Sequence, residues 1–354
     1  MGTDHGRERL LVTLPLRPPY APMELLQVES IPDGAQWQYE PKWDGFRCLA
    51  FRDGNEVYLQ SKAGEPLARY FPEIVEQLRA LPARSFVLDG ELMVQLGDEL
   101  SFDALLQRIH PADSRVTRLA KETPARYVVF DLLVDAESRD LTTATLAERR
   151  AALEGFARRY LKASPIALSP AANVRAQVDA WYAGVGNALD GVIAKRRDLP
   201  YASGTREGGV KIKRLRTADC VVGGYRLNKE RDGIGSLLLG LYDDNGKLNH
   251  VGFTSGFAAR ERGPLLERLR EIQKPPGFTG SAPGGPSRWK QTEEPWFPLA
   301  PKLVVEVRYD HVTGDRFRHG TKIMRWRSDK NPRQCTMDQL RVAEAASPLA
   351  LLAR

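Results

Sequence analysis

The sequence has few cysteines and no long hydrophobic run. Only Cys48, Cys220 and Cys335 occur in 354 residues, and no two have a CxxC spacing, so neither a disulfide framework nor a cysteine-based zinc site is expected. Apolar runs such as Leu237–Leu239 are too short to cross a bilayer, and the opening MGTDHGRERL carries acids instead of a signal region. These absences predict a soluble, cytoplasmic protein.

The positive charge is unevenly distributed along the chain. Residues 1–215 contain 29 Lys and Arg against 29 Asp and Glu, whereas residues 216–354 contain 23 against 16. The whole formal net charge of +7 therefore lies in the last 139 residues. A basic balance suits a polyanionic partner such as nucleic acid, although a merely solvated surface explains it equally well without a motif.

The first 215 residues alternate strand and helix patterns. Residues 46–51 and 56–61 flank RDGN as a hairpin, and residues 71–81 have helical spacing. Further strands are expected at 85–94, 125–134, 190–196 and 209–214, and further helices at 146–161 and 174–185. The pattern predicts a mixed α and β domain.

From residue 219 the sequence changes to glycine-punctuated strands. These lie at 219–227, 235–253 with a DNG turn, and 302–310, and one helix is expected from Arg260 to Ile272. Several short strands with a single helix favour a Greek-key barrel of the OB type, whose grooves commonly bind nucleic acid. Residues 274–298 are expected to form a long loop, with Trp289 and Trp296 as its anchors.

The stretch EPKWDGFR, residues 40–47, raises the question of whether Lys42 is a surface amine or a nucleophile. A KxDG tetrapeptide alone is weak, since about one chain in ten of this length contains it by chance. A catalytic role for Lys42 gains support from further short stretches along the chain. Each of them places a charged residue in an otherwise buried strand, and they follow one another in a fixed order. They are SKAG at 61, DGEL at 89, VVFDLL at 128, DGVIAK at 190, KIKR at 211 and FRHG…RWRSDK at 317–330.

In this order, the stretches resemble the lysine nucleotidyltransferase superfamily, and specifically the ATP-dependent DNA ligases of bacteria. The sequence is most similar in pattern to the small stand-alone ligase C type and to the ligase module of the end-joining ligases. The resemblance implies an α+β fold, with a nucleotidyltransferase (adenylation) domain at 1–215 and an OB-fold β-barrel domain at 216–354. It also implies ATP and Mg²⁺, with Mn²⁺ as an alternative, nicked duplex DNA as the partner, a role in DNA repair and a monomeric enzyme.

The chemistry of such an enzyme explains why these residue types occur together. A lysine must be deprotonated to attack phosphorus, yet its free pKa is about 10.4, so neighbouring cations or burial must favour the neutral amine. Arg47, Lys211, Lys213 and a bound metal are expected to supply that effect and to screen the triphosphate. Carboxylate ligands without soft partners favour magnesium.

Carried over residue by residue, the resemblance makes Lys42 the nucleophile that forms lysyl-AMP. Glu91 and Asp190 correspond to the metal-associated acids. The positions that match nucleotide contacts are Glu40 and Phe130 at the adenine, Arg47 and Arg206 at the AMP sugar and phosphate or the nick, Glu91 at the ribose, Lys211 and Lys213 at the α-phosphate, and Arg327, Asp329 and Lys330 at the pyrophosphate.

The DNA contacts are assigned to Ser61 and Lys62 at the 5′-phosphate of the nick and to Arg316 and Arg318 in the second domain. Two positions depart from the family pattern. Many relatives have Ser-Arg where this chain has Ser61-Lys62, which exchanges a bidentate fork for a point charge. Many have Glu-Gly where it has Asp190-Gly191, one methylene shorter, so that carboxylate is expected to reach a metal through water.

Several residues also have a plainly structural interpretation. Phe130 on its own pattern suits a hydrophobic core, and Asp89 suits either bracing a strand or a direct role. His311 and His319 lack a partner at metal-ligand spacing. Arg316 and Arg318, with Lys322, also suit a solvated basic face.

The rival functions are an RNA ligase, a GTP-using capping enzyme and a non-catalytic OB-fold binder of nucleic acid. The RWRSDK ending argues against most RNA ligases, and the complete set of lysines and acids argues against a binder without activity.

Overall fold

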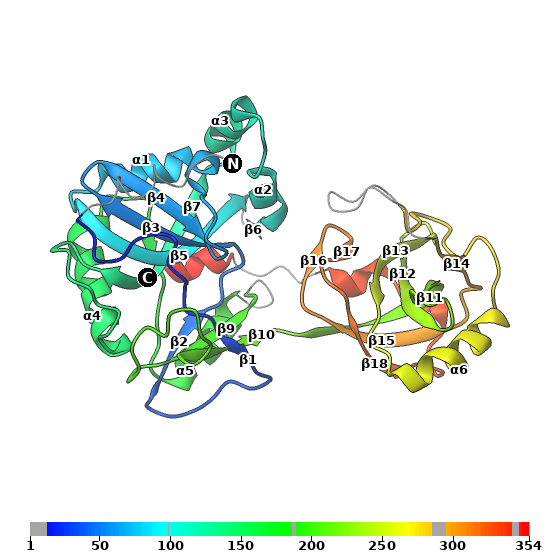
Figure 1. The fold of residues 1–354 in the computed structure, drawn as a ribbon. Helices are drawn as coiled ribbons and strands as arrows, with labels where there is room; N and C mark the ends of the chain where they lie inside the picture. Colours follow the sequence, from blue (N-terminus) through cyan, green and yellow to red (C-terminus); the bar gives the residue numbers. More distant parts are fainter. Residues whose placement is uncertain (1–12, 98, 186–188, 285–294, 342–346, 354) are drawn as a thin grey trace. The chain divides into compact units, whose positions relative to one another are not determined.

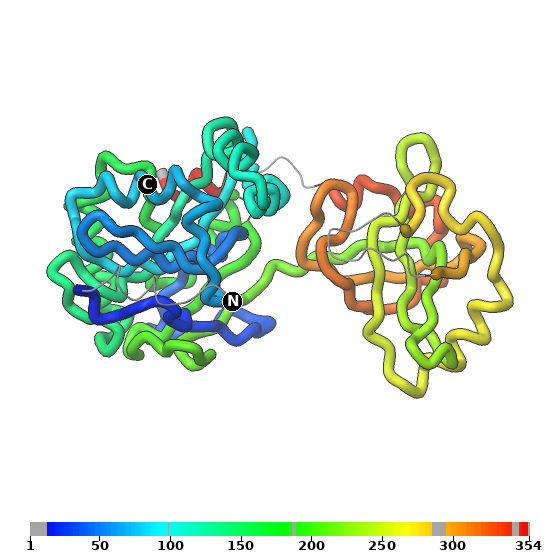
Figure 2. Tube along the Cα trace, turned by 45° about the horizontal axis from the view of Figure 1, so that its top comes forward, coloured from blue at the N-terminus to red at the C-terminus, as the bar shows by residue number. Residues whose placement is uncertain are grey.

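The computed structural model describes residues 13–97, 99–185, 189–284, 295–341 and 347–353. The chain forms two compact units, one of residues 1–214 and 344–354, the other of residues 215–343 (Figure 1). The carboxyl-terminal segment differs from the expected division, which placed all of 216–354 in the second domain. It belongs to the first unit because Leu351 is buried in a hydrophobic cluster there. In Figures 1 and 2 its red turn lies among the blue and green elements.

The first unit is built around a six-stranded sheet. Its strands are β3 (Phe46–Asp53), β4 (Glu56–Ser61), β5 (Ser85–Leu96), β6 (Glu99–Leu100), β7 (Ala125–Val134) and β8 (Ala167–Leu168). The order is β4-β3-β5-β7-β8, with β6 on β5, and every pair is antiparallel except β7 and β8. The long strands β3, β5 and β7 are apolar on both faces, which places the core on either side of the sheet.

Helices of the first unit lie around this sheet. They are α1 (Pro72–Ala80), α2 (Phe102–Gln107), α3 (Asp113–Glu122) and α4 (Leu146–Phe156). A capping box between Thr145 and Glu148 starts α4, as its sequence indicates. The sequence analysis did not identify α2 and α3, which are short helices that each bury a single residue, Leu105 and Val116.

A smaller sheet completes the first unit. Its strands are β1 (Leu26–Gln27), β2 (Trp37–Pro41), β9 (Gly191–Arg196) and β10 (Gly209–Lys213), in the order β1-β10-β9-β2. Helix α5 (Arg175–Val185) packs on it through Val178, which joins a core with Tyr39 and Val192. The charged stretches at residues 40, 190 and 211 thereby come onto neighbouring strands.

The second unit is a closed five-stranded barrel with a helix between its third and fourth strands. Strands β11, β12 and β13 form a meander, and β15 and β18 follow on the other side of β11, all antiparallel. A parallel bridge from Thr254 to Thr321 closes the barrel beside β18. This is the topology of an OB fold. The elements are β11 (Arg216–Leu227), β12 (Ile234–Tyr242), β13 (Leu248–Thr254), α6 (Ala259–Arg270), β14 (Phe297–Pro298), β15 (Val304–Tyr309), β16 (Val312–Thr313), β17 (Arg316–Phe317) and β18 (Lys322–Trp326).

The predicted long loop of residues 274–298 lies only partly within the described residues. Trp296 packs edge-on against Phe278, with ring centroids 5.6 Å apart, and joins the barrel core. This packing agrees with its predicted role as an anchor, whereas Trp289 lies outside the described residues. Within the described part of the chain, no helix has the length and hydrophobicity needed to span a membrane.

Candidate active site

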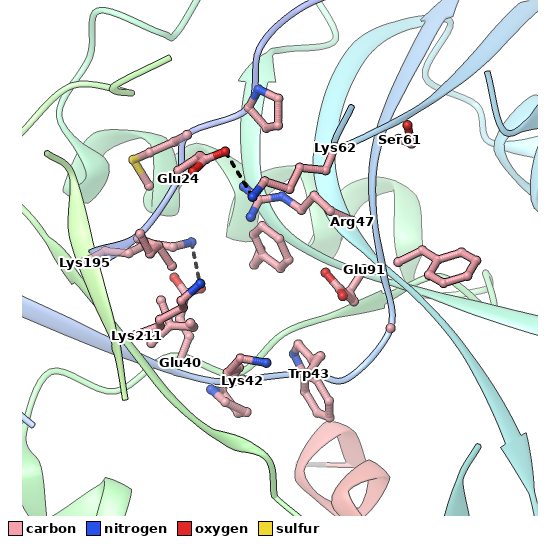
Figure 3. A pocket seen from close by; sticks show the side chains of 18 of the residues that line it. Glu24, Glu40, Lys42, Trp43, Arg47, Ser61, Lys62, Glu91, Lys195 and Lys211 are labelled. Carbon is pink, nitrogen blue, oxygen red and sulfur yellow. Dashed lines mark ion pairs between the residues drawn. The ribbon is translucent and has the colours of Figure 1, made fainter. Parts of the chain in front are cut away.

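A cavity of about 490 Å³ opens in the first unit where the two sheets meet. Its walls come from β2, β3, β5, β7, β9 and β10, together with the chain before β1 and the turn after β4. Figure 3 shows its charged side chains converging on one space. The predicted site residues that line it are Glu40, Lys42, Arg47, Ser61, Lys62, Glu91, Phe130 and Lys211.

Lys42 lies at the end of β2, where two glycines allow close approach of the backbone. A Cβ at residue 45 would lie 2.1 Å from the carbonyl oxygen of Leu92, and a Cβ at residue 191 would lie 2.1 Å from that of Ile212. The glycines of KWDG and DGVIAK are therefore required by packing. The Lys42 amide donates to the carbonyl of Gly191 at 3.0 Å, which ties the lysine loop to β9.

The ammonium of Lys42 is paired with the carboxylate of Asp190. Burial disfavours the charged amine, but Asp190, followed by Glu91 and Asp44, outweighs that effect, and the pKa of Lys42 is raised. The sequence had suggested that neighbouring cations keep this amine neutral. Burial, which the sequence analysis also named, acts in that direction, but the carboxylates that act on Lys42 outweigh it.

A lysine with a lowered pKa does occur in the cavity, and it is Lys211. Partial burial lowers the pKa of Lys211, and repulsion from Lys42, Lys62, Lys213 and Arg206 adds to the effect. Lys211 and Lys213 stand two residues apart on β10, and Lys211 lines the cavity. The side of the cavity formed by β10 is therefore positively charged.

Arg47 is held rigidly by a buried acid. Its guanidinium forms a two-pronged contact with Asp89, whose side chain is 0% exposed and also accepts from the hydroxyl of Tyr201 at 2.6 Å. The guanidinium lies 4.7 Å from the centre of the Phe130 ring. Asp89 therefore holds Arg47 in place and does not itself line the cavity.

Glu91, which lies on β5 as Asp89 does, has a raised pKa. Burial raises the pKa of Glu91 to about 7, against the opposing attraction of Arg47 and Lys42. It lines the cavity beside Arg47 and Lys42 (Figure 3). At neutral pH its carboxyl group is therefore close to its titration midpoint.

Lys195 is a cavity residue that sequence reasoning did not single out. Its ammonium lies 2.7 Å from the carboxylate of Glu40, both side chains are 3% exposed, and Gln38 donates to the other oxygen of Glu40 at 2.8 Å. The ammonium also lies 4.6 Å from the centre of the Phe130 ring. The alternation of β9 could have revealed it, because Ile193 and Lys195 face the same side and both line the cavity.

Glu24 is a second residue that the sequence did not reveal. Its carboxylate bridges Lys62 and Arg206, 3.0 Å from each, at the edge of the cavity. The hydrogen bonds from Lys62 and Arg206 lower the pKa of Glu24. Ser61, by contrast, uses its hydroxyl to accept the amide of Glu65 at 3.0 Å, within the turn.

Arg327, Asp329 and Lys330 belong to the second unit and form a separate network there. Arg327 contacts Asp219 at 2.9 Å and Asp329 at 2.9 Å, and Lys330 lies 3.6 Å from Asp219. The hydrogen bond from Arg327 lowers the pKa of Asp329 to about 2.

The other two predicted DNA contacts lie on the loop and short strands that precede β18. Arg316 contacts Nδ1 of the buried His250 at 2.7 Å, and the amide of Arg318 donates to the carbonyl of His311. Their role toward DNA stays a prediction.

A metal held by protein side chains alone does not fit the part of the chain that the structure describes. Among the described residues, no group of three or more His, Cys, Asp or Glu side chains is placed to bind one. His319 instead lies 3.1 Å from Asp310. Glu91 and Asp190 both act on Lys42, and two carboxylates that share their ion with substrate phosphates match the usual ligation of magnesium.

The sequence matches two family models. One, described as ATP dependent DNA ligase domain, covers residues 25–213, and the other, described as ATP dependent DNA ligase C terminal region, covers residues 230–330. The chain is 44% identical to DNA ligase C1 of Mycolicibacterium smegmatis, over 92% of this chain and 95% of that protein. It is 43% identical to DNA ligase C of Mycobacterium tuberculosis, over 92% and 95%.

A solved structure of a Lig E DNA ligase shares the fold. It is 18% identical, with a TM-score of 0.51, and the match covers 86% of this chain and 100% of that chain.

Proposed function

Because the chain belongs to the family of ATP-dependent DNA ligases, we propose that it seals nicks in duplex DNA through an AMP group carried on Lys42. The observation that carries this proposal is the position of Lys42. It lines the cavity, its ammonium is paired with Asp190 and feels the charge of Glu91, and the cationic strand β10 forms another wall. A surface amine in a turn would have none of these neighbours.

In the first step, Nζ of Lys42 attacks the α-phosphorus of ATP, the phosphorus–nitrogen bond forms, and the bond to the bridging oxygen of pyrophosphate breaks. The amine must first lose a proton, and this requires the ion pair of Lys42 with Asp190 to open. Lys211 and Lys213 bind the phosphates as charge moves toward the leaving group. The attraction that raises the pKa of Lys42 weakens once this pair has opened.

The adenine is bound by the buried pair of Glu40 and Lys195, with Phe130 on its face. The carboxylate of Glu40 accepts from the exocyclic amine, and the ammonium of Lys195 donates to a ring nitrogen. Phe130 stacks on the base, while Arg47 holds the sugar and phosphate. Asp89 and Tyr201 keep Arg47 in place throughout, because their contacts do not involve the ligand.

In the second step, an oxygen of the 5′-phosphate of the nick attacks the phosphorus of the lysine-bound AMP. The bond to Nζ breaks, the amine regains a proton, and the DNA carries AMP. Lys62 and Arg206 bind this phosphate after leaving Glu24, since two cations around one anion are already in place at the cavity edge. In the third step, the 3′-hydroxyl attacks the 5′-phosphorus, a phosphodiester forms, and AMP leaves.

Glu91 and Asp190 are the residues that would hold Mg²⁺, with Mn²⁺ as an alternative. The ion, when bound, neutralises charge on the phosphate that is attacked. Glu91 is fixed on β5 beside Arg47, and Asp190 lies against Lys42. These two residues therefore determine where the charge of the phosphate would be neutralised.

The second unit contributes cations to two different steps. Arg327 and Lys330 orient pyrophosphate in the first step, and Arg316 and Arg318 contact the DNA backbone. We propose that a hinge near residues 214–217 allows the two units to move relative to each other. The enzyme acts as a monomer on cytoplasmic DNA, in DNA repair.

The experiment that tests the proposal is incubation with labelled ATP, GTP or NAD, followed by denaturing electrophoresis and by a nick-sealing assay on DNA and RNA duplexes. Label from ATP alone that survives denaturation, with sealing of nicked DNA, is the expected result. Label from GTP would point to a capping enzyme, sealing of RNA alone to an RNA ligase, and no covalent label to a binder of nucleic acid.

A further inference from the structure

The carboxyl-terminal segment is a part of the first unit that the proposed mechanism does not use. Residues Pro348–Ala353 form a short 3₁₀ turn, in which the amide of Ala350 donates to the carbonyl of Ser347 at 2.9 Å. Leu351 is 7% exposed, so its side chain is covered by a partner surface.

That partner surface is the hydrophobic cluster beneath the nucleotide cavity. Leu351 shares it with Trp43, Val128, Phe130 and Leu189, and Leu349 and Leu352 pack at its border. Two members, Trp43 and Phe130, also line the cavity. Figure 3 shows the faint red turn directly beside the labelled Trp43.

Trp43 links this cluster to the lysine loop. It follows Lys42 in the sequence, is 6% exposed, and donates from Nε1 to the hydroxyl of Ser169 at 2.9 Å. The position of its ring therefore constrains the backbone that carries Lys42. Phe130, on the other side, supports both Arg47 and Lys195 through its ring.

We propose that residues 347–353 are a positioning element of the nucleotide cavity, which fixes Trp43 and Phe130 from below and so sets the geometry of Lys42 and of the bound ATP. This inference rests on the proposed function, since it assigns the segment a role in the same adenylation step. It also means that the second unit, residues 215–343, is joined in sequence to the first unit at both of its ends. A complete first unit for ATP binding therefore requires chain from both sides of the barrel.

The test compares the full chain with three variants: a truncation after residue 346, Leu351→Ser and Leu351→Met. Ala350→Ser is the matched control, because Ala350 is exposed in the same turn. Lysyl-AMP formation is followed at a series of ATP concentrations. Thermal unfolding is recorded on the same preparations.

We expect the truncation and Leu351→Ser to raise the KM for ATP by about tenfold, as loss of one buried leucine contact predicts. Leu351→Met, which conserves volume, should restore most of the affinity, and Ala350→Ser should match the full chain. A segment that only adds stability would lower the amount of active enzyme, and hence the maximal rate, while the KM for ATP stayed constant. That pattern, or an unchanged KM in Leu351→Ser, would overturn the inference.

The outcome separates this inference from the proposed function. If the full chain forms no lysyl-AMP, the proposed function fails. If the full chain forms it and both Leu351→Ser and the truncation do so with the same KM, only the role of the segment fails.

Discussion

The two units treat their positive charges differently. Around the cavity of the first unit, Lys42, Arg47 and Lys195 each contact a carboxylate, and their side chains are at most 19% exposed. In the second unit, Arg327 is also paired and 17% exposed, but Arg325 and Arg341 form ion pairs at 64% exposure. Residues 1–215 contain 29 basic against 29 acidic residues, whereas residues 216–354 carry the whole excess. The difference indicates a preformed site in one unit and a surface for long-range attraction in the other.

The difference also has a physical consequence for substitutions. A buried pair that loses one partner leaves an unsatisfied charge, so changes in the first unit should abolish chemistry. An exposed cation is screened by solvent, and its loss should weaken binding in a graded, salt-dependent manner. The following predictions test this contrast.

The largest effect is expected for Lys42→Arg. Arginine keeps the charge but stays protonated and cannot attack phosphorus, so lysyl-AMP formation should fall by at least about a thousandfold. Labelled ATP and denaturing electrophoresis measure the effect, with Lys62→Arg as the control that changes an exposed lysine of the same cavity edge. A Lys42→Arg enzyme that still carries label would show that the nucleophile lies elsewhere.

The next effect concerns one step only. If Arg327 and Lys330 orient pyrophosphate, the double variant Arg327→Ala, Lys330→Ala should lose self-adenylation by about a hundredfold, as for loss of charged groups on a leaving phosphate. Sealing of a pre-adenylated nick should change by only a few fold. Both rates are measured on one preparation at one salt concentration. Equal losses in the two assays would make these residues ordinary DNA contacts.

A pH effect of intermediate size is expected from Glu91. Its pKa is raised to about 7 in the folded protein, so the fraction of carboxylate falls by about tenfold for each pH unit below that value. The apparent affinity for Mg²⁺ during lysyl-AMP formation should therefore weaken below pH 7 and level off above it. The charged and titratable groups near Glu91 are Arg47, Lys42, Asp44 and Asp89.

The Glu91→Gln variant provides the control for titration of ATP itself. It should bind Mg²⁺ weakly and without the inflection near pH 7, whereas Glu65→Gln should keep that inflection. An inflection that persists in Glu91→Gln would assign the pH dependence to another group.

The second unit should dominate the salt dependence of DNA binding. Replacing Arg316 and Arg318 by alanine should reduce the slope of log K against log salt concentration by about 1.8, since each phosphate contact contributes about 0.9. The exposed pair Arg158 and Arg159 in the first unit is the matched control and should leave the slope unchanged. Equal changes for the two pairs would remove the distinction between the units.

The smallest effect is expected for Glu24→Gln. Removing the carboxylate frees Lys62 and Arg206 for the 5′-phosphate of the nick, so the preference for a phosphorylated over a 5′-hydroxyl nick should rise by about two- to fivefold. Glu207→Gln removes an exposed charge next to Arg206 and should leave that preference constant. If both variants tighten binding to both nicks alike, Glu24 acts only through net charge.

The sequence predicted the cavity better than its electrostatics. Lys42, Glu91, Phe130 and Lys211 were identified because the stretches that contain them resemble those of the ATP-dependent DNA ligases, and the two sheets bring these stretches together at the cavity. The ion pair of Lys42 with Asp190 joins residues 148 positions apart, so spacing could not reveal that the pKa of Lys42 is raised. Glu24 was missed for a similar reason, because it lies before β1 and contacts cations from two distant segments.

The fold, like the site, was predicted only in part from the sequence. The strands of both units have the apolar runs and turn residues that a sequence reveals, and the barrel was expected from them. The return of residues 347–353 to the first unit was not expected, since a short apolar end has no periodicity that identifies its partner.

The central claim is that the amine of Lys42 carries the AMP. The most direct measurement is peptide mapping by mass spectrometry of the enzyme after incubation with ATP and Mg²⁺. We predict a single adenylated peptide, with AMP on Lys42 in the segment EPKWDGFR. AMP on Lys195, Lys211 or any other lysine, while Lys42 stays unmodified, would contradict the account.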